Sequence, residues 1–287
     1  MKYDPLSETE MAFLSDAKVF LENESLTMRI ANTVGKPMVW AQEMLPDRIS
    51  KSVQKVVDKS LKGALEVALK TVEKSQNQNW DDAIHGSNKS RILHSTMTGL
   101  AGGLGGFFGE VGLVFELPIT TALMMRNIAN IASEFGFCKS NPATPLECLY
   151  VFTLGSKKSK SDDDLDSAYF STRYALSTAM KQGAEFLAKN SARVVLDNIN
   201  AGTAPTILNF INKVATYFEV VVTEKMLAEA LPVVGSVGGA AVNIAFTEHF
   251  GRAAKYHFGM LGLEQKYGRN LVEELYRNKD LKREKAA

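Results

Sequence analysis

The sequence predicts an all-α protein, a multi-helix globular bundle built around two glycine-rich central helical segments. Two observations support this fold class. Apolar residues recur with a period of about 3.6 along several long segments, which is typical of amphipathic helices. Small residues recur at four-residue spacing in one further segment, a pattern that lets helix backbones approach closely, and a second segment is also rich in small residues. At 287 residues, the chain is long enough for one large helical domain or two closely packed halves.

The amino-terminal region begins with a capping box. Ser7-x-x-Glu10 lets a serine and a glutamate satisfy the free N–H groups of a first helical turn, so a helix is expected from about Glu8 to Glu22. Further helical sequence follows up to Leu45. We assign residues 1–45 to an amino-terminal helical extension.

The clearest periodic segment follows Pro46. The segment from Asp47 to Ser75 contains seven basic and four acidic residues, and most of its lysines fall outside the apolar stripe. Such a helix either lies on an anionic membrane surface or packs on a core with its lysines in water, and we favour the second arrangement. The apolar stripe consists of Ile49, Val53, Val56, Val57, Leu61, Ala64, Leu65, Ala68, Leu69 and Val72. The candidate membrane-surface residues are Lys51, Lys55, Lys59 and Lys62.

The first glycine-rich segment extends from Gly99 to Gly136, after a polar connection expected over residues 76–90. We expect a helix up to Val114, a break around Glu116–Pro118, and a second helix that Gly136 ends. A narrow polar seam crosses that second helix. It comprises Thr120, Asn127, Asn130 and Glu134.

The rest of the chain also reads as helical. A shift of 126 positions superposes six identical residues of 109–136 on 235–262, which suggests an internal repeat. A charged, hydrophobic-poor loop is where the chain would divide into two halves. The expected elements are a short helical segment at 145–154, the loop at 156–167, helices at 168–198 and 206–231, the second small-residue segment at 235–262, a helix at 263–275 interrupted by Gly268, and a charged tail at 277–287.

Four ordered motifs resemble the EcsC family. They occupy residues 102–136, 145–155, 169–176 and 238–268, and the resemblance extends over about 51–276. The second motif reads PLECLYVFTLG, and the third carries Tyr169 and Arg173-Tyr174. The resemblance implies a largely helical domain, here 46–276. The family takes its name from a bacterial protein encoded beside the subunits of an ABC transporter, and it supplies no agreed activity or catalytic residues.

The candidate polar site lies in the first and fourth motifs. On a helical wheel Asn243, Thr247 and His257 share one face, which we expect to be buried. These side chains either meet Glu116 and Arg126 in a pocket for a headgroup, an anion or a metal, or form a buried network that fixes helix register, which we favour. The full set of candidate residues is Glu116, Thr120, Thr121, Arg126, Asn243, Thr247, His249, Arg252 and His257.

Several site classes are disfavoured by spacing. The chain lacks the zinc-protease, serine-hydrolase elbow and phosphate-loop patterns, and the separation of His249 and His257 does not suit zinc. We predict no cofactor and no metal. The net charge of +1 gives no case for nucleic acid. Cys138 and Cys148 are expected to be reduced, unrelated thiols.

The functional expectation is a binding or accessory protein. The amino terminus lacks the build of a secretory signal, so we expect a cytoplasmic protein that is peripheral to the inner membrane. The expected partners are anionic membrane lipid or an integral-membrane transport complex. The alternative is a hydrolase that uses Glu116, His249 or His257. Whether the protein is an enzyme stays open.

Overall fold

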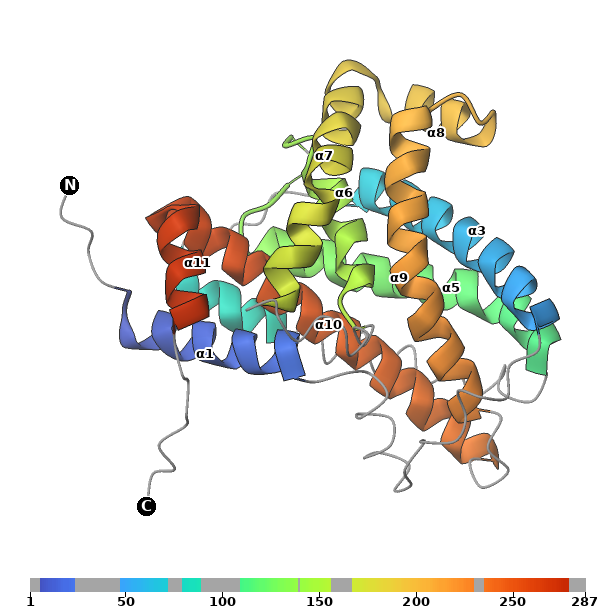
Figure 1. The fold of residues 1–287 in the computed structure, drawn as a ribbon, viewed down its shortest axis with the longest axis horizontal. Coiled ribbons are helices and arrows are strands. Elements are labelled where there is room, and N and C mark those ends of the chain that lie inside the picture. The colour runs from blue at the N-terminus through green and yellow to red at the C-terminus, as the bar shows by residue number, and fades with distance from the viewer. Residues whose placement is uncertain are drawn as a thin grey trace.

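The computed structural model describes residues 6–23, 47–71, 79–88, 109–138, 140–155, 167–229 and 235–278, and everything below refers to these. They form helices and short connections, and no strand occurs among them, which confirms the all-α prediction (Figure 1). The elements are α1 (Glu8–Asn23), α3 (Asp47–Thr71), a helical stretch at 80–88, α5 (Gly109–Glu134), α6 (Thr144–Tyr150), the 3₁₀ turn η2 (Val151–Thr153), α7 (Ala168–Lys189), α8 (Ala192–Asn200), α9 (Pro205–Glu229), α10 (Gly235–Tyr267) and α11 (Arg269–Asn278).

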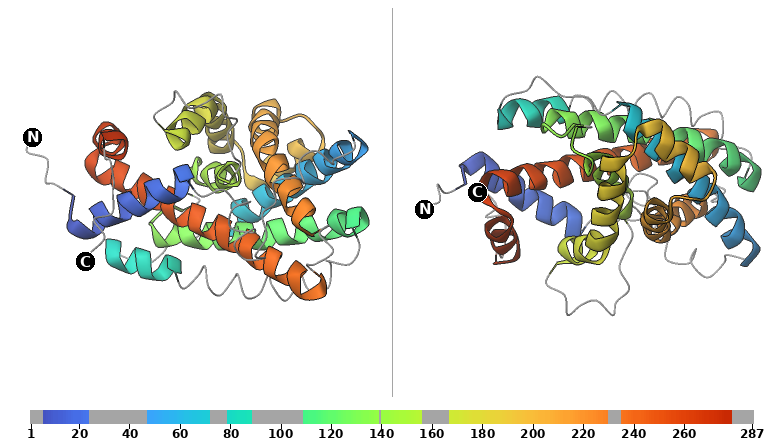
Figure 2. Two further views of the ribbon diagram at one scale, coloured as in Figure 1. Left: turned by 60° about the horizontal axis from the view of Figure 1, so that its bottom comes forward. Right: turned by 90° about the horizontal axis from the view of Figure 1, so that it is seen from above.

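Two long helices, α5 and α10, form the centre of the bundle and pack against each other. Helix α3 runs beside α5, and both begin at the same end of the molecule (Figures 1 and 2). Helices α7 and α9 pack together across the layer that α3, α5 and α10 form. Helices α1 and α11 lie at the other end of the molecule from the start of α3 and α5. The two glycine-rich segments of the sequence therefore do supply the central helices.

Helix α1 begins with the predicted capping box. The Ser7 N–H donates to Oε2 of Glu10 at 2.8 Å, and the Glu10 N–H donates to Oγ of Ser7 at 3.2 Å. At its other end, Glu22 accepts hydrogen bonds from the Ser167 hydroxyl (2.7 Å) and the Tyr276 hydroxyl (2.9 Å). One carboxylate thus ties α1 to the start of α7 and to α11.

Helix α3 packs its apolar stripe into the core, mainly against α5 and α9. The stripe residues from Val53 to Ala68 are buried, whereas Lys55 and Lys59 are exposed. Lys62 pairs with Asp58 at 2.7 Å. The favoured arrangement, core packing with lysines in water, is what the structure shows for these residues.

Helix α5 continues through Pro118, so the predicted break at Glu116–Pro118 is wrong. An interior proline removes one hydrogen bond and costs about 3 kcal/mol in an isolated helix. Here α5 packs along α3 and α10, and helix stability in proteins comes mainly from such packing. The predicted end at Gly136 is confirmed. Gly136 has φ +83°, and the Phe137 N–H donates to the Ala132 carbonyl at 3.0 Å.

The connection expected at 76–90 is in fact helical over 80–88, which corrects that prediction. The Asn79 side chain accepts a hydrogen bond from the Asp82 N–H at 2.8 Å and so caps this stretch. Trp80 then packs edge-on against Phe13, with ring centroids 5.0 Å apart. A polar segment becomes helical because one cap and one aromatic anchor suffice.

The later elements follow the prediction with differences at 168–198 and at 262–267. Helix α10 continues through Gly262 to Tyr267, so the helix expected at 263–275 does not form as one element. The expected helix at 168–198 is divided at Asn190 and Ser191, where Ser191 caps α8 through the Val194 N–H. In the run of three valines on α9, Val221 and Val222 are buried and Val220 is 43% exposed. The predicted short segment at 145–154 forms α6 and η2, and Gly268 separates α10 from α11 with φ +87°.

Some predictions lie outside the described residues. They concern the second helical part of the extension at 24–46, the glycines before Gly109, the loop at 156–166, the interruption at Pro232 and the tail beyond Asn278. Among the helices that the structure does describe, none is both long and apolar enough to cross a bilayer.

Candidate functional site

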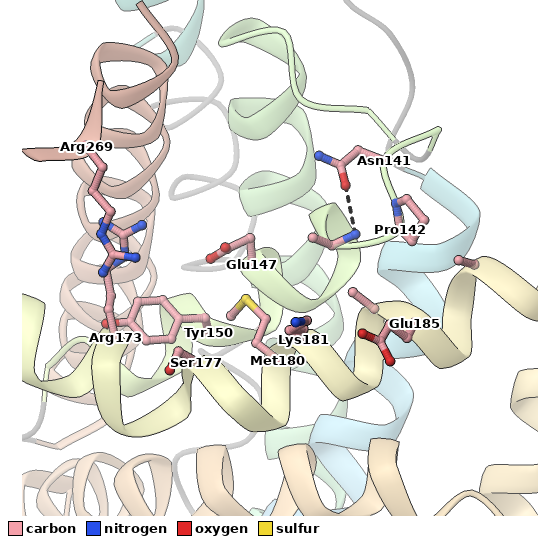
Figure 3. Close-up of a pocket in the computed structure, with 13 residues that line it drawn as sticks. Asn141, Pro142, Glu147, Tyr150, Arg173, Ser177, Met180, Lys181, Glu185 and Arg269 are labelled. Carbon is pink, nitrogen blue, oxygen red and sulfur yellow. Dashed lines mark hydrogen bonds between the residues drawn. The ribbon is translucent and has the colours of Figure 1, made fainter. Parts of the chain in front are cut away.

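The candidate site is a pocket of about 500 Å³ between α6, α7 and the start of α11 (Figure 3). A second cavity of about 300 Å³ adjoins it and is bordered in part by α10. The two cavities share Asn141, Ala143, Glu147 and Arg269 in their walls. Pockets of this size are typical of small-molecule sites.

Helix α6 places Glu147 in this pocket. The helix opens with Thr144-Pro145, and proline is favoured in a first turn because its missing N–H has no partner there anyway. Just before it, the Asn141 side chain accepts a hydrogen bond from the Ala143 N–H at 3.0 Å and fixes the turn. Glu147 then lies in the first turn, where a carboxylate is favourable, and its side chain is 18% exposed.

A chain of hydrogen bonds leads from this carboxylate into the core. Oε2 of Glu147 lies 2.9 Å from Nε2 of His257, and Nδ1 of His257 lies 3.0 Å from the Tyr169 hydroxyl. The Tyr150 ring packs on His257 with centroids 4.9 Å apart. His257 and Tyr169 are buried, so Glu147 is the member of the chain that reaches the cavity.

The pKa shifts fix the protonation states. Burial lowers the pKa of His257 and outweighs the opposing effect of the Glu147 carboxylate. Burial raises the pKa of Glu147, but the hydrogen bond with His257 and the charges of His257, Arg173 and Arg269 outweigh it, so the pKa is lowered. At neutral pH the His257 Nε2–H therefore donates to an ionised Glu147, and Nδ1 accepts from Tyr169.

Arg173 forms the second polar feature of the pocket floor. Its guanidinium binds Glu264 of α10 through both Nη atoms, with Nη2 3.0 Å from Oε2, and both side chains are about nine-tenths buried. The guanidinium also lies 5.4 Å from the centroid of the Tyr169 ring. Burial lowers the Arg173 pKa, but Tyr169 and the Glu264 carboxylate raise it by more. Arg173 therefore stays positively charged and links α7 to α10.

The rim carries further charges. Arg269, at the start of α11, lines both cavities and stacks 4.7 Å above the centroid of the Tyr174 ring. Lys181 and Glu185 of α7 are exposed at the opposite side of the pocket (Figure 3).

The predicted face of α10 is buried, as expected. Asn243, Thr247 and His257 are all 0% exposed. However, no hydrogen-bond partner is found among the described residues for either amide atom of Asn243 or for the hydroxyls of Thr247 and Thr121. Thr120 is also buried. These groups lie in packed interior rather than in either cavity.

The other predicted residues lie apart from the pocket. Glu116 pairs with Lys225 of α9 at 2.7 Å, and Lys225 is 1% exposed. His249 Nε2 donates to the Leu154 carbonyl at 2.8 Å. Arg126 is exposed, and Arg252 lies 4.7 Å from the centroid of the Phe20 ring. None of the predicted residues lines either described cavity. His257 is connected to the pocket by its hydrogen bond with Glu147.

The cysteines and candidate metal ligands are also placed. Cys148 is a buried free thiol whose pKa is raised by burial, and Cys138 is half-buried with its sulfur 3.0 Å from the Ser140 hydroxyl. Within the described ranges, no group of three or more histidine, cysteine, aspartate or glutamate side chains is arranged to hold a metal ion.

Comparison with known proteins gives one finding. The model of the EcsC protein family matches residues 16–260. The chain belongs to the EcsC family. Searches of curated proteins and of solved structures found no significant match. The match thus covers most of the chain, including α6, α7 and α10 up to residue 260, but it assigns no activity.

Sequence reasoning missed most of this EcsC pocket. Glu147, Tyr169, Arg173 and Glu264 all lie within the motifs quoted for the resemblance, yet they were read only as markers of the family. A sequence pattern does point to these residues, because each of three separate apolar motifs contains one or two polar side chains.

Proposed function

We propose that this EcsC protein is a binding or accessory protein that docks on an anionic membrane surface. The observation that carries the proposal is a pair of large apolar side chains exposed on α5. Phe115 is 71% exposed and Ile119 is 60% exposed, and they stand four residues apart on one helix face. Val114 beside them is 42% exposed.

Exposed basic residues lie on the neighbouring helix. Helices α3 and α5 run side by side from the same end of the bundle (Figure 1), and Lys55 and Lys59 are exposed on the first half of α3. Aromatic and aliphatic side chains that enter the lipid interface, next to lysines that attract anionic headgroups, are the two components of interfacial binding. Lys62 is expected to contribute less, because it is paired with Asp58. The side chain of Lys51 lies outside the part of the molecule that the structure describes.

Vesicle flotation tests the proposal. The protein should float with phosphatidylcholine vesicles that contain phosphatidylglycerol and less with phosphatidylcholine alone. The double variants Phe115→Glu/Ile119→Glu and Lys55→Glu/Lys59→Glu should each lose binding. Val194→Glu is the matched control, since Val194 is a 43% exposed apolar residue on α8.

Two results would contradict this function. One is failure of the wild-type protein to float with any vesicle, and the other is unchanged flotation of both double variants. Binding to native membranes but not to protein-free vesicles would instead favour an integral-membrane transport complex as the partner. A cytoplasmic location at the inner membrane stays a prediction.

A second candidate function is hydrolysis at the pocket. It is favoured by one observation, the neutral His257 bonded to a Glu147 carboxylate that reaches the cavity. Such a carboxylate can act as a general base toward water. Hydrolysis of chromogenic esters or phosphoesters that is abolished in Glu147→Gln would support it, and absence of any turnover by the wild-type protein would count against it.

A further inference from the structure

The pocket beside α6 presents one carboxylate that is only partly engaged. Oε2 of Glu147 is taken by His257, and no described residue donates to its Oε1. The carboxylate nevertheless points into the cavity, toward the arginine side of the pocket (Figure 3). A carboxylate oxygen of this kind suits a hydrogen-bond donor supplied by a ligand, and an ammonium group most of all.

The pocket also presents one guanidinium that is loosely paired. The closest approach of Arg269 to Glu273 is 3.9 Å, and Glu273 already accepts from the Tyr174 hydroxyl (2.6 Å) and from Arg277 (2.8 Å). The Arg269 guanidinium lies over the Tyr174 ring, and among the described residues no acceptor lies within hydrogen-bond distance of its N–H groups, so they can serve an acceptor on a ligand. Arg173, in contrast, forms a two-bond ion pair with Glu264.

These two groups restrict the charge of a ligand. A simple cation at Glu147 would be repelled by Arg269 and Arg173, both of which act electrostatically on that carboxylate. A simple anion at Arg269 would be repelled by Glu147. A molecule that carries both charges satisfies both groups. Tyr150, Met180 and Pro142 provide an apolar wall for its body.

We propose that the pocket binds a small zwitterion, with a primary ammonium at Glu147 and a carboxylate or phosphate at Arg269. The proposal is independent of membrane docking, because the pocket uses α6, α7 and α11, whereas the docking surface uses α3 and α5. The anionic group has two sources, the carboxylate of a free amino acid or the phosphate of an aminoalkyl phosphate. The experiment separates them.

Calorimetric titration of the full chain is the test. The probes are a set of free L-amino acids and phosphoethanolamine, together with the N-acetylated form of each probe and the carboxamides of the amino acids. At least one zwitterion should bind, and removal of either charge should weaken it about tenfold or more. The class that binds identifies the anionic group.

Variants locate the binding. Glu147→Gln keeps an acceptor for His257, and Arg269→Gln changes an exposed rim residue, so both should fold. Each variant should bind the zwitterion with an affinity about tenfold or more below that of the wild-type protein. Glu66→Gln and Arg126→Gln, which alter charges outside the pocket, should bind as the wild-type protein does. The proposal is overturned if no probe binds, if the N-acetylated probe binds equally well, or if Glu147→Gln and Arg269→Gln leave the affinity unchanged.

Discussion

Polar side chains gather in two parts of this protein, and the two parts differ in how those side chains are partnered. At the pocket, Glu147, His257 and Tyr169 form a continuous hydrogen-bonded chain that ends at a cavity. On the central helices, the buried polar groups of Thr121, Asn243 and Thr247 have no partner within the part of the chain that the structure describes, and no described cavity adjoins them. Buried polar groups stabilise a protein only when they are satisfied.

The difference teaches that burial of polar residues does not by itself mark a site. The sequence places both sets on glycine-rich or motif-bearing helices, and a helical wheel cannot tell which face will meet a hydrogen-bond partner. The pocket set is hydrogen-bonded and reaches a cavity. For the set on the central helices no partner is found among the described residues, so we expect those groups to lower the stability of the fold.

The largest expected effect is at the pocket floor. Arg173→Ala should lower the free energy of unfolding by about 3–5 kcal/mol, because it leaves Glu264 buried and unpaired. Urea unfolding measures it. Arg126→Ala, at an exposed arginine, is the control and should stay within about 0.5 kcal/mol of the wild-type protein. Equal losses of unfolding free energy in the two variants would contradict a stabilising role for the Arg173–Glu264 pair.

A smaller loss of unfolding free energy is expected when the hydrogen-bonded chain of Glu147, His257 and Tyr169 is interrupted. Tyr169→Phe removes the hydroxyl that donates to His257 and should cost about 1–2 kcal/mol. A double-mutant cycle with His257→Gln isolates the contact, and the two changes should be coupled. Strict additivity in urea unfolding would mean that the hydrogen bond contributes nothing.

The opposite sign is expected on the central helices. Thr247→Val keeps the shape of the side chain and removes an unpartnered hydroxyl, so it should stabilise the protein by about 1 kcal/mol. Thr153→Val is the matched control, since the Thr153 hydroxyl donates to the Tyr150 carbonyl at 2.8 Å and its loss should destabilise. Destabilisation by both changes, measured by thermal unfolding, would show that Thr247 has a partner in solution.

The smallest expected change is in the pH dependence of stability. The pKa of Glu147 in the folded protein is below the ordinary 4.5, so its contribution is present above pH 4.5 and is lost as the pH falls through the folded value. Glu147→Gln should therefore show a shallower loss of stability below pH 4.5. Parallel unfolding profiles of the variant and the wild-type protein would contradict the lowered pKa.

Local signals in the sequence predicted much of the fold. The capping box at Ser7, the stripe of α3 and the glycine stops at Gly136 and Gly268 act within a few residues, and each was predicted correctly. The break at Pro118 was wrong because packing along α3 and α10 outweighs a local helix cost, which no local pattern reports.

The pocket was less predictable for the same reason. Glu147 and His257 are 110 positions apart, and Arg173 and Glu264 are 91 apart. Their contacts depend on how α6, α7 and α10 cross, and periodicity along one helix carries no information about that. His257 was selected as a candidate, but its partner was not.

The central claim is that a ligand binds at Glu147 and not among the buried groups of the central helices. Imidazole NMR of the four histidines, with assignments from His249→Gln and His257→Gln, tests it most directly when the bound zwitterion is titrated in. We predict that the His257 resonances shift, since His257 contacts Glu147, while those of His249 stay in place. A shift of His249 with His257 unchanged would contradict the account.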